Sequence, residues 1–456
     1  MSGPIRVPAV DRPLVSILVL TYGAGDWVAR ALAALVASTA PVYELVVLDN
    51  ASPDGTGSWL ADNLEGATLL RNDTNVGFGP GQNQAALAAR GRYLCLLNSD
   101  ALVEAGWLEP LVADLEQVRD CGAVVPRLLN LDGTLQEAGA VVGAEGWTMA
   151  MGYGDDPARP WYRFPRYVSY GSGACLCLRR STFLELGGFD ARYGLGYYED
   201  VDLCFRLREQ GMRIVYEPRS VVRHVRGASS PAAGVVRLRE RNAQRFRDRW
   251  PHALSFLPSL ADLPAHPYRV VAARDVEAPD RVLVMGARLP RSAEDRVARL
   301  ALGMMAACGE TRVTVVGLAD AEPAEEMASL MDAGVELVWG IDDWDDWMER
   351  CRCHYSVAVV TPGGAGTAGR ALELLAAYQP QAAVVVDVEG PGELRSFPPE
   401  VLARAEAIWC EDQWQEGDLE RALAGVGVVT TGAAGWGGRV AGWSHRRPAS
   451  SASLGP

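Results

Sequence analysis

Two aspartates follow apolar segments of the kind that form buried strands. Asp49 comes directly after the run at 45–48, and Asp100 comes three residues after the run at 93–97. Ligands of open α/β sheets lie at the carboxyl ends of the strands, so both carboxylates are expected to point into a cleft. An aspartate there can equally be a turn or capping residue. Two such aspartates in one domain favour binding of Mg²⁺ or Mn²⁺ by their carboxylate oxygens. An acidic protein can hold a diphosphate through such a cation.

Two adjacent carboxylates, Glu199 and Asp200, open a helix that we predict over 199–210. A helix N-terminus stabilises negative charge, and this effect alone could explain both residues. The same position keeps Asp200 ionised and directed away from the helix, as a base that deprotonates a hydroxyl group requires. Adjacent helical residues lie about 100° apart, so one of the two is expected to face a substrate.

A histidine and a glycine-rich loop are further candidates. His224 is the single histidine of segment 13–251 and lies between apolar residues. Such a histidine is more often structural, but a neutral ring could supply a nitrogen ligand to the cation at Asp100. The loop at 75–83 precedes a predicted helix and would let a nucleotide approach the backbone. A tight turn explains this loop equally well.

The charge balance excludes several classes of function. The 456 residues include 57 acidic and 43 basic side chains, a net charge of −14, and every basic residue is an arginine. A nucleic-acid binder would carry a basic face, so no nucleic-acid partner is expected. A Walker-A phosphate loop needs a lysine, so that loop is excluded as well. No stretch approaches the about 20 apolar residues of a membrane span. The nine cysteines lack paired metal spacing, which indicates a reduced, cytoplasmic location, with attachment to the inner face of the plasma membrane left open.

Strands alternate with helices on both sides of a proline-rich segment, which predicts an α/β protein with two doubly wound domains. The expected boundaries are 13–251 for the first domain, 252–278 for a linker, 279–440 for a Rossmann-like accessory domain and 441–456 for a disordered tail. A loop-rich, aromatic segment over a binding face is expected at 130–200. The predicted strands are 15–20, 45–48, 67–70, 93–97, 281–285, 313–316, 335–338, 356–360 and 383–386.

Seven motifs occur in order along the first domain. They read ILVLTY, VVLDNASPDGT, NVGFGPGQNQA, CLLNSDA, GSGACLCLRRSTFLELGGFD, YYEDVDLCFRLREQG and VVRHVRG. Residues 14–250 thereby resemble the inverting family 2 glycosyltransferases of GT-A fold, particularly the bacterial rhamnosyltransferase-like branch. Residues 279–440 resemble the N-terminal half of a GT-B glycosyltransferase. For that domain we expect acceptor docking, scaffolding or dimerisation.

The resemblance implies a role for each matching residue. Asp200 would be the catalytic base with Glu199 beside it, and Asp100 and His224 would hold Mg²⁺ or Mn²⁺. The acceptor pocket would be shaped by Gly173, Ala174 and Tyr197. A UDP- or dTDP-sugar donor would be held by Thr21, Tyr22, Asp49, Asn50, Ser52, Asn75, Gly77, Gln82, Asn83, Ser99 and Asp100.

The chain departs from the family pattern at several places, one of them Gly23, where an asparagine is common. The metal motif reads Asn98-Ser99-Asp100 and retains only its last acid, and Gln82 stands where an arginine is common. Phe246 stands where processive members have glutamine, so addition of a single sugar is expected.

The predicted function is therefore inverting transfer of one sugar, with dTDP-rhamnose as a candidate donor. The acceptor would be a glycan, a lipid-linked molecule or a small molecule in polysaccharide or glycoconjugate biosynthesis, and a homodimer is left open. One alternative is a nucleotidyltransferase, which would carry a glycine-rich signature with Lys or Arg that residues 21–25 lack. The other is a non-catalytic scaffold that binds sugar nucleotides, which would have lost its base or metal ligands.

Overall fold

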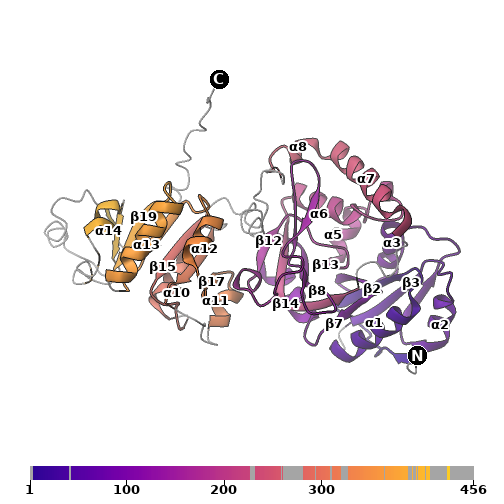
Figure 1. Ribbon diagram of the computed structural model, residues 1–456. Coiled ribbons are helices and arrows are strands. Elements are labelled where there is room, and N and C mark those ends of the chain that lie inside the picture. Colours follow the sequence, from indigo (N-terminus) through magenta and orange to yellow (C-terminus); the bar gives the residue numbers. More distant parts are fainter. Residues whose placement is uncertain are drawn as a thin grey trace, which may run out of the picture. The chain divides into compact units, whose positions relative to one another are not determined.

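The computed structural model divides into two compact units, Met1–Glu277 and Ala278–Pro456 (Figure 1). The predicted tail at 441–456 and most of the predicted linker lie outside the described residues, and helix α8 (Pro251–Leu254) runs into the linker's expected start. The residues described are 4–40, 43–225, 232–257, 259, 281–292, 294–308, 311–319, 327–363, 365–388, 393, 397, 399–405, 407–410 and 429–431.

Four parallel strands form one half of a ten-stranded sheet in the N-terminal unit, in the order β5–β3–β2–β6. These strands are β5 (Thr68–Arg71), β3 (Tyr43–Asp49), β2 (Val15–Thr21) and β6 (Tyr93–Asn98). Parallel strands covered on both faces read as continuous apolar runs, which is why the sequence located β2, β3 and β6, whereas the half-exposed β5 showed only a short apolar run. The structure confirms these four predictions.

Helices cover both faces of this half of the sheet (Figure 1). On one face, Leu32 of α1 (Gly25–Ser38) is fully buried in a cluster with alternate residues of β2 and β3. On the other face, α3 (Phe78–Ala88) approaches closely because it carries Gly81, where a Cβ atom would lie 2.3 Å from Leu20 Cδ1. α3 therefore holds the loop that precedes it against the carboxyl ends of the strands.

The other half of the sheet is mixed and was not predicted. β13 runs antiparallel between β6 and β8, and β14 lies parallel to β8. The segment expected to be loop-rich, 130–200, contains several strands of three residues each, and Tyr162 and Phe164 there are fully buried. A strand of three residues is too short to show the alternation of apolar and polar residues from which a strand is predicted. The strands are β7 (Ala101–Val103), β8 (Cys121–Leu129), β9 (Leu135–Glu137), β10 (Ala140–Val142), β11 (Thr148–Ala150), β12 (Arg166–Val168), β13 (Cys175–Arg179) and β14 (Arg213–His224).

Further helices complete this unit on both halves of the sheet. The predicted helix at 199–210 is confirmed as α6 (Glu199–Glu209). The other helices are α2 (Thr56–Asn63), α4 (Leu108–Gln117), α5 (Arg180–Glu185) and α7 (Ala232–Arg249), and the short pair β1 (Ile5–Arg6) and β4 (Leu64–Glu65) forms a separate ribbon.

The C-terminal unit is a seven-stranded parallel sheet in the order β17–β16–β15–β18–β19–β20–β21. The strand order reverses between β15 and β18, as in a doubly wound fold, which confirms the predicted Rossmann-like domain. Its strands are β15 (Arg281–Gly286), β16 (Arg312–Gly317), β17 (Glu336–Val338), β18 (Val357–Val360), β19 (Ala383–Val388), β20 (Ala407–Cys410) and β21 (Val429–Thr431). Its helices include α10 (Arg296–Cys308), α11 (Ala328–Asp332), α12 (Trp344–Arg350), α13 (Ala365–Tyr378) and α14 (Pro399–Arg404).

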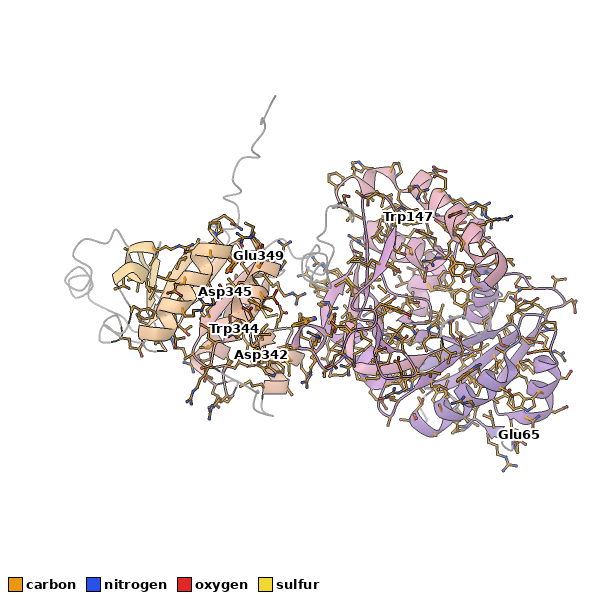
Figure 2. All side chains as sticks on the ribbon, viewed as in Figure 1. Glu65, Trp147, Asp342, Trp344, Asp345 and Glu349 are labelled. Carbon is orange, nitrogen blue, oxygen red and sulfur yellow. The ribbon has the colours of Figure 1, made fainter. Side chains whose placement is uncertain are left out.

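Acidic side chains gather around α12 (Figure 2). They have local partners: Asp345 accepts hydrogen bonds from Arg370 and, at 3.0 Å, from Tyr378 Oη, both on α13. Glu349 pairs with Arg352. These contacts join α12 to α13 and to the turn after α12. Across the part of the chain that the structure describes, no helix has the length and apolar character needed to span a bilayer.

Candidate functional site

Two adjoining cavities lie at the carboxyl ends of β2, β3 and β6 in the N-terminal unit. The larger cavity has a volume of about 830 Å³, and the smaller has a volume of about 500 Å³. The larger cavity is lined by Gly173 and Ala174, predicted for the acceptor pocket, by Glu199 and Asp200, predicted as the catalytic pair, and by His224, predicted as a metal ligand. Tyr22, Asn50, Asn75 and Ser99 line the smaller one. Phe78, Asn98, Asp100, Leu195, Tyr197 and Val235 line both.

Several residues predicted to touch the donor nucleotide instead support the loops around the smaller cavity. Asp49 Oδ1 accepts a hydrogen bond from the Ser52 backbone N–H at 3.1 Å, and Ser52 Oγ accepts one from Gly23 N–H at 2.8 Å. Thr21 Oγ1 donates to the Gly23 carbonyl at 2.9 Å. These bonds shape the turn that carries Tyr22, which does line the smaller cavity.

Two residues of α3 do not line either cavity. Asn83 forms both backbone hydrogen bonds of Phe189: its Nδ2 donates to the Phe189 carbonyl, and its Oδ1 accepts from the Phe189 N–H, each at 2.8 Å. Gln82 has no solvent exposure, and neither polar atom of its amide has a hydrogen-bond partner within the described structure. Asn83 therefore joins α3 to the loop before α6.

Asn50 ties the glycine-rich loop to the end of β3. Its Nδ2 donates to Asn75 Oδ1 at 2.9 Å, and its Oδ1 accepts from the Val76 N–H at 3.1 Å. The next loop residue, Gly77, has a φ of 94°, and a Cβ atom there would lie 2.3 Å from the Gly194 carbonyl oxygen. Gly77 thus does not line the cavity but lets this loop approach the loop before α6.

Asp100 and His224 lie together at the junction of the two cavities. His224 ends β14, which pairs antiparallel with β7, and its Nε2 lies 3.2 Å from Asp100 Oδ1 and 3.1 Å from Asn98 Nδ2. Its Nδ1 lies 2.7 Å from Gln136 Oε1. A carboxylate oxygen and an imidazole nitrogen directed at the same space fit a divalent cation. Among the described residues no group of three or more His, Cys, Asp or Glu side chains gathers in this way.

The carboxylates at the start of α6 differ in their surroundings. Asp200 Oδ2 accepts from the Gly173 N–H, and Oδ1 accepts from the Val201 N–H, both at 2.9 Å. Burial raises the pKa of Asp200, and these two hydrogen bonds oppose the rise by favouring its charged form. Glu199 is buried with no partner for Oε2, and burial together with the nearby charge of Asp200 raises its pKa well above the usual range. Asp200 is therefore the carboxyl group of the pair that is better suited to carry the charge.

The loop that leads into α6 is strained and is held from α7. Tyr197 and Tyr198 both have a φ of 72°, a left-handed conformation that large side chains rarely adopt. The buried side chain of Asn242 donates to the carbonyls of Tyr193, Gly196 and Tyr197 at 2.7, 2.8 and 3.0 Å. Asn242 belongs to none of the sequence motifs, so the sequence did not predict its role.

Asp202 is a second anchor of α6. Its carboxylate has no solvent exposure and accepts hydrogen bonds from Tyr193 Oη and Trp250 Nε1, each at 3.0 Å, and from Arg206 Nε at 2.9 Å. Arg249 also contacts it at 3.2 Å. These bonds join α6 to the end of α7, so Asp202 stabilises the site without lining it.

Two arginines of α7 line the cavities and were not predicted. Arg239 lines the larger cavity, Arg241 lines the smaller one, and both are exposed. A usable signal was present in the sequence, since this 18-residue helix carries six arginines in an acidic chain that lacks lysine.

Comparisons with known proteins place the N-terminal unit among sugar-transferring enzymes. Residues 16–147 match the family model described as Glycosyl transferase family 2. The chain is 32% identical over 243 residues to the O-antigen biosynthesis protein RfbC of Myxococcus xanthus, a match that covers 51% of this chain but only 19% of that protein. It is 29% identical over 240 residues to the N-acetylglucosaminyl-diphospho-decaprenol L-rhamnosyltransferase of Mycobacterium tuberculosis, covering 48% of this chain and 78% of the relative.

A solved structure also aligns with the chain. It is the crystal structure of GalNAc-T7 with UDP, GalNAc and Mn²⁺, with a TM-score of 0.44 and 17% identity. The alignment covers 58% of this chain and 52% of that one.

Proposed function

We propose that the N-terminal unit, which matches the Glycosyl transferase family 2 model over residues 16–147, transfers one sugar from a UDP- or dTDP-activated donor to an acceptor hydroxyl group, with inversion. The observation that carries the proposal is the position of Asp200, whose carboxylate is oriented by two backbone N–H groups in a cavity that adjoins a second one. The acceptor would occupy the larger cavity and the donor nucleotide the smaller one. The anomeric carbon would lie where the two meet.

In this mechanism Asp200 is the general base. Its carboxylate takes the proton of the acceptor hydroxyl group while the hydroxyl oxygen forms a bond to the anomeric carbon. The bond between that carbon and the diphosphate oxygen breaks, and the nucleoside diphosphate leaves with the electron pair. The raised pKa of Asp200 supports this role, because a stronger base accepts a proton more readily from a hydroxyl group.

Asp100 and His224 would hold Mg²⁺ or Mn²⁺, which when bound supplies charge neutralisation for the departing diphosphate. The nitrogen ligand favours Mn²⁺, because Mg²⁺ is held mainly by oxygen. Arg241, which lines the smaller cavity, would add positive charge near the same diphosphate. Arg239 lines the larger cavity and favours the charged form of Asp200.

The wider assignment follows the relatives. The names of the two curated relatives refer to O-antigen biosynthesis and to rhamnosyl transfer onto a lipid diphosphate. We therefore keep dTDP-rhamnose as a candidate donor and a glycan, a lipid-linked molecule or a small molecule as acceptor, with the reaction at the cytoplasmic side of the membrane. For the C-terminal unit we retain acceptor docking, scaffolding or dimerisation.

The test uses the full chain with a panel of UDP-, dTDP- and GDP-sugars and Mn²⁺, read by mass spectrometry. Family 2 chemistry predicts that one donor is slowly hydrolysed to a nucleoside diphosphate even without acceptor. Donor that binds but is never consumed would support the scaffold alternative. Formation of a nucleotide sugar from a nucleoside triphosphate and a sugar phosphate would support the nucleotidyltransferase. A parallel series with EDTA tests the metal, and undiminished donor affinity there would refute the role of Asp100 and His224.

A further inference from the structure

Gln136 of β9 contacts both the ring and the backbone of His224. Its Nε2 donates to the His224 carbonyl at 2.9 Å and to Asn130 Oδ1 at 3.0 Å, while its Oε1 lies 2.7 Å from His224 Nδ1. A backbone carbonyl can only accept, so the amide atom that faces it must be the nitrogen. The amide oxygen of Gln136, which can only accept, therefore faces Nδ1, and Nδ1 must carry a proton.

This orientation determines what the other ring nitrogen can do. A neutral imidazole carries one N–H, so protonation of Nδ1 leaves Nε2 with a free lone pair. That lone pair faces Asp100 Oδ1 at 3.2 Å and Asn98 Nδ2 at 3.1 Å. Asp100 by itself would favour the opposite tautomer, because a proton on Nε2 could be donated to its carboxylate. Gln136 and Asp100 thus act on the histidine in opposite directions.

We propose that Gln136 is a positioning residue that holds His224 in the tautomer with a proton on Nδ1 and so keeps Nε2 available as a metal ligand. The inference rests on the proposed function, in which Asp100 and His224 hold a divalent cation. Without the Gln136 acceptor, the proton moves to Nε2, the His224 ring donates to Asp100 Oδ1, and Nε2 loses the lone pair that it would offer to the cation. The loss of such a partner to a ligating histidine typically weakens metal binding by about 10–100-fold.

The pairing of three strands brings Gln136 and His224 together. Gln136 is 6% exposed, on a strand of three residues that pairs with β8, and β8 in turn pairs with β14, which ends at His224. The two residues are separated by 88 positions in the sequence.

The experiment compares the full chain with Gln136→Met, which removes the acceptor at similar size, and with Asn130→Ala as a matched control. Asn130→Ala breaks one of the two hydrogen bonds from Gln136 Nε2 but leaves the contact with Nδ1. The proteins carry ¹⁵N-labelled histidine, and the His224 signals are identified by their absence in His224→Asn. Ring nitrogen shifts are recorded without metal, at a pH where every imidazole signal has stopped moving. The affinity for Mn²⁺ alone is measured by electron paramagnetic resonance.

We expect Nδ1–H in the wild type and in Asn130→Ala, Nε2–H in Gln136→Met, and Mn²⁺ binding about 10–100-fold weaker in Gln136→Met only. Gln136→Glu keeps an acceptor for Nδ1–H but places its second oxygen against the His224 carbonyl, so it is expected to recover the tautomer with only part of the affinity. A wild-type ring protonated on Nε2 would overturn the inference, as would equal losses of affinity in Gln136→Met and Asn130→Ala. If Gln136 sets the tautomer but the wild type fails to bind Mn²⁺, the metal site of the proposed function is wrong and the positioning role stands.

Discussion

The two carboxylates at the start of α6 allow a paired test of the catalytic base. Asp200→Asn and Glu199→Gln each replace a carboxylate with an amide of nearly the same shape. Because burial and the charge of Asp200 raise the pKa of Glu199 well above its usual range, glutamine imitates the protonated form that we expect in the native protein. Glu199→Gln should therefore retain most of the activity, whereas Asp200→Asn removes the group that accepts the proton.

The magnitude of the loss follows from the chemistry of the step. General-base catalysis contributes about 10²–10⁴-fold, which corresponds to about 3–5.5 kcal/mol at about 1.36 kcal/mol for each tenfold change. In Asp200→Asn, the new NH₂ group must also face either the Gly173 N–H or the Val201 N–H, each of which now donates to a carboxylate oxygen at 2.9 Å. A lost hydrogen bond of this kind costs about 1–3 kcal/mol of stability, which the removal of a buried charge partly offsets.

The assay measures kcat with the donor and acceptor found by the panel, donor affinity by calorimetry, and thermal unfolding. We expect Asp200→Asn to reduce kcat by about 10²–10⁴-fold with unchanged donor affinity, because Asp200 does not line the smaller cavity. Comparable losses in both variants, or a larger loss in Glu199→Gln, would refute the assignment of Asp200 as the base.

Three further predictions concern the surroundings of this pair. Arg239 favours the charged form of Asp200, so Arg239→Gln should raise the pKa of Asp200. The acidic limb of the pH profile of kcat/KM should then move to higher pH. An acidic limb at the same pH would contradict the electrostatic role of Arg239. The pKa of Glu199 is raised in the folded protein, so the contribution of Glu199 to stability is present below the unfolded pKa and is lost as pH rises. Glu199→Gln should therefore raise the melting temperature more at pH 8 than at pH 4. A shift that does not depend on pH would argue against a protonated Glu199. Asn242→Ala removes three hydrogen bonds to the loop before α6, so it should lower the free energy of unfolding by about 1–3 kcal/mol and also reduce kcat. Loss of stability without loss of activity would limit Asn242 to a structural role.

The predictability of each strand depended on its length and burial. β2, β3 and β6 were found because both of their faces are covered, so their residues are apolar without interruption. β14 was missed although it has 12 residues, because Pro218 and several charged residues interrupt its apolar pattern. β9 has only three residues, too few for any periodic signal.

The sequence by itself determined the two α/β domains, the central parallel strands, the helix that begins at Glu199, and the candidate residues Asp100, Asp200 and His224. These features are local, because each depends on residue types within a few positions of one another. The order of the motifs adds the resemblance to a known family. The meeting of Asp100 with His224, which are 124 positions apart, required β7 and β14 to pair, and sequence spacing carries no information on that pairing.

Only the tertiary structure decided which of the nominated side chains reach the cavities. Asp49 was expected to point into a cleft, but it contacts the Ser52 N–H and lies 3.7 Å from Arg71 Nε, and it does not line either cavity. Gln136 and Asn242 acquire their contacts from residues far away in the sequence, so no motif includes them. The physical reason is the same in each case. A buried polar side chain forms hydrogen bonds with the groups that tertiary packing places beside it, and these groups can be far away in the sequence.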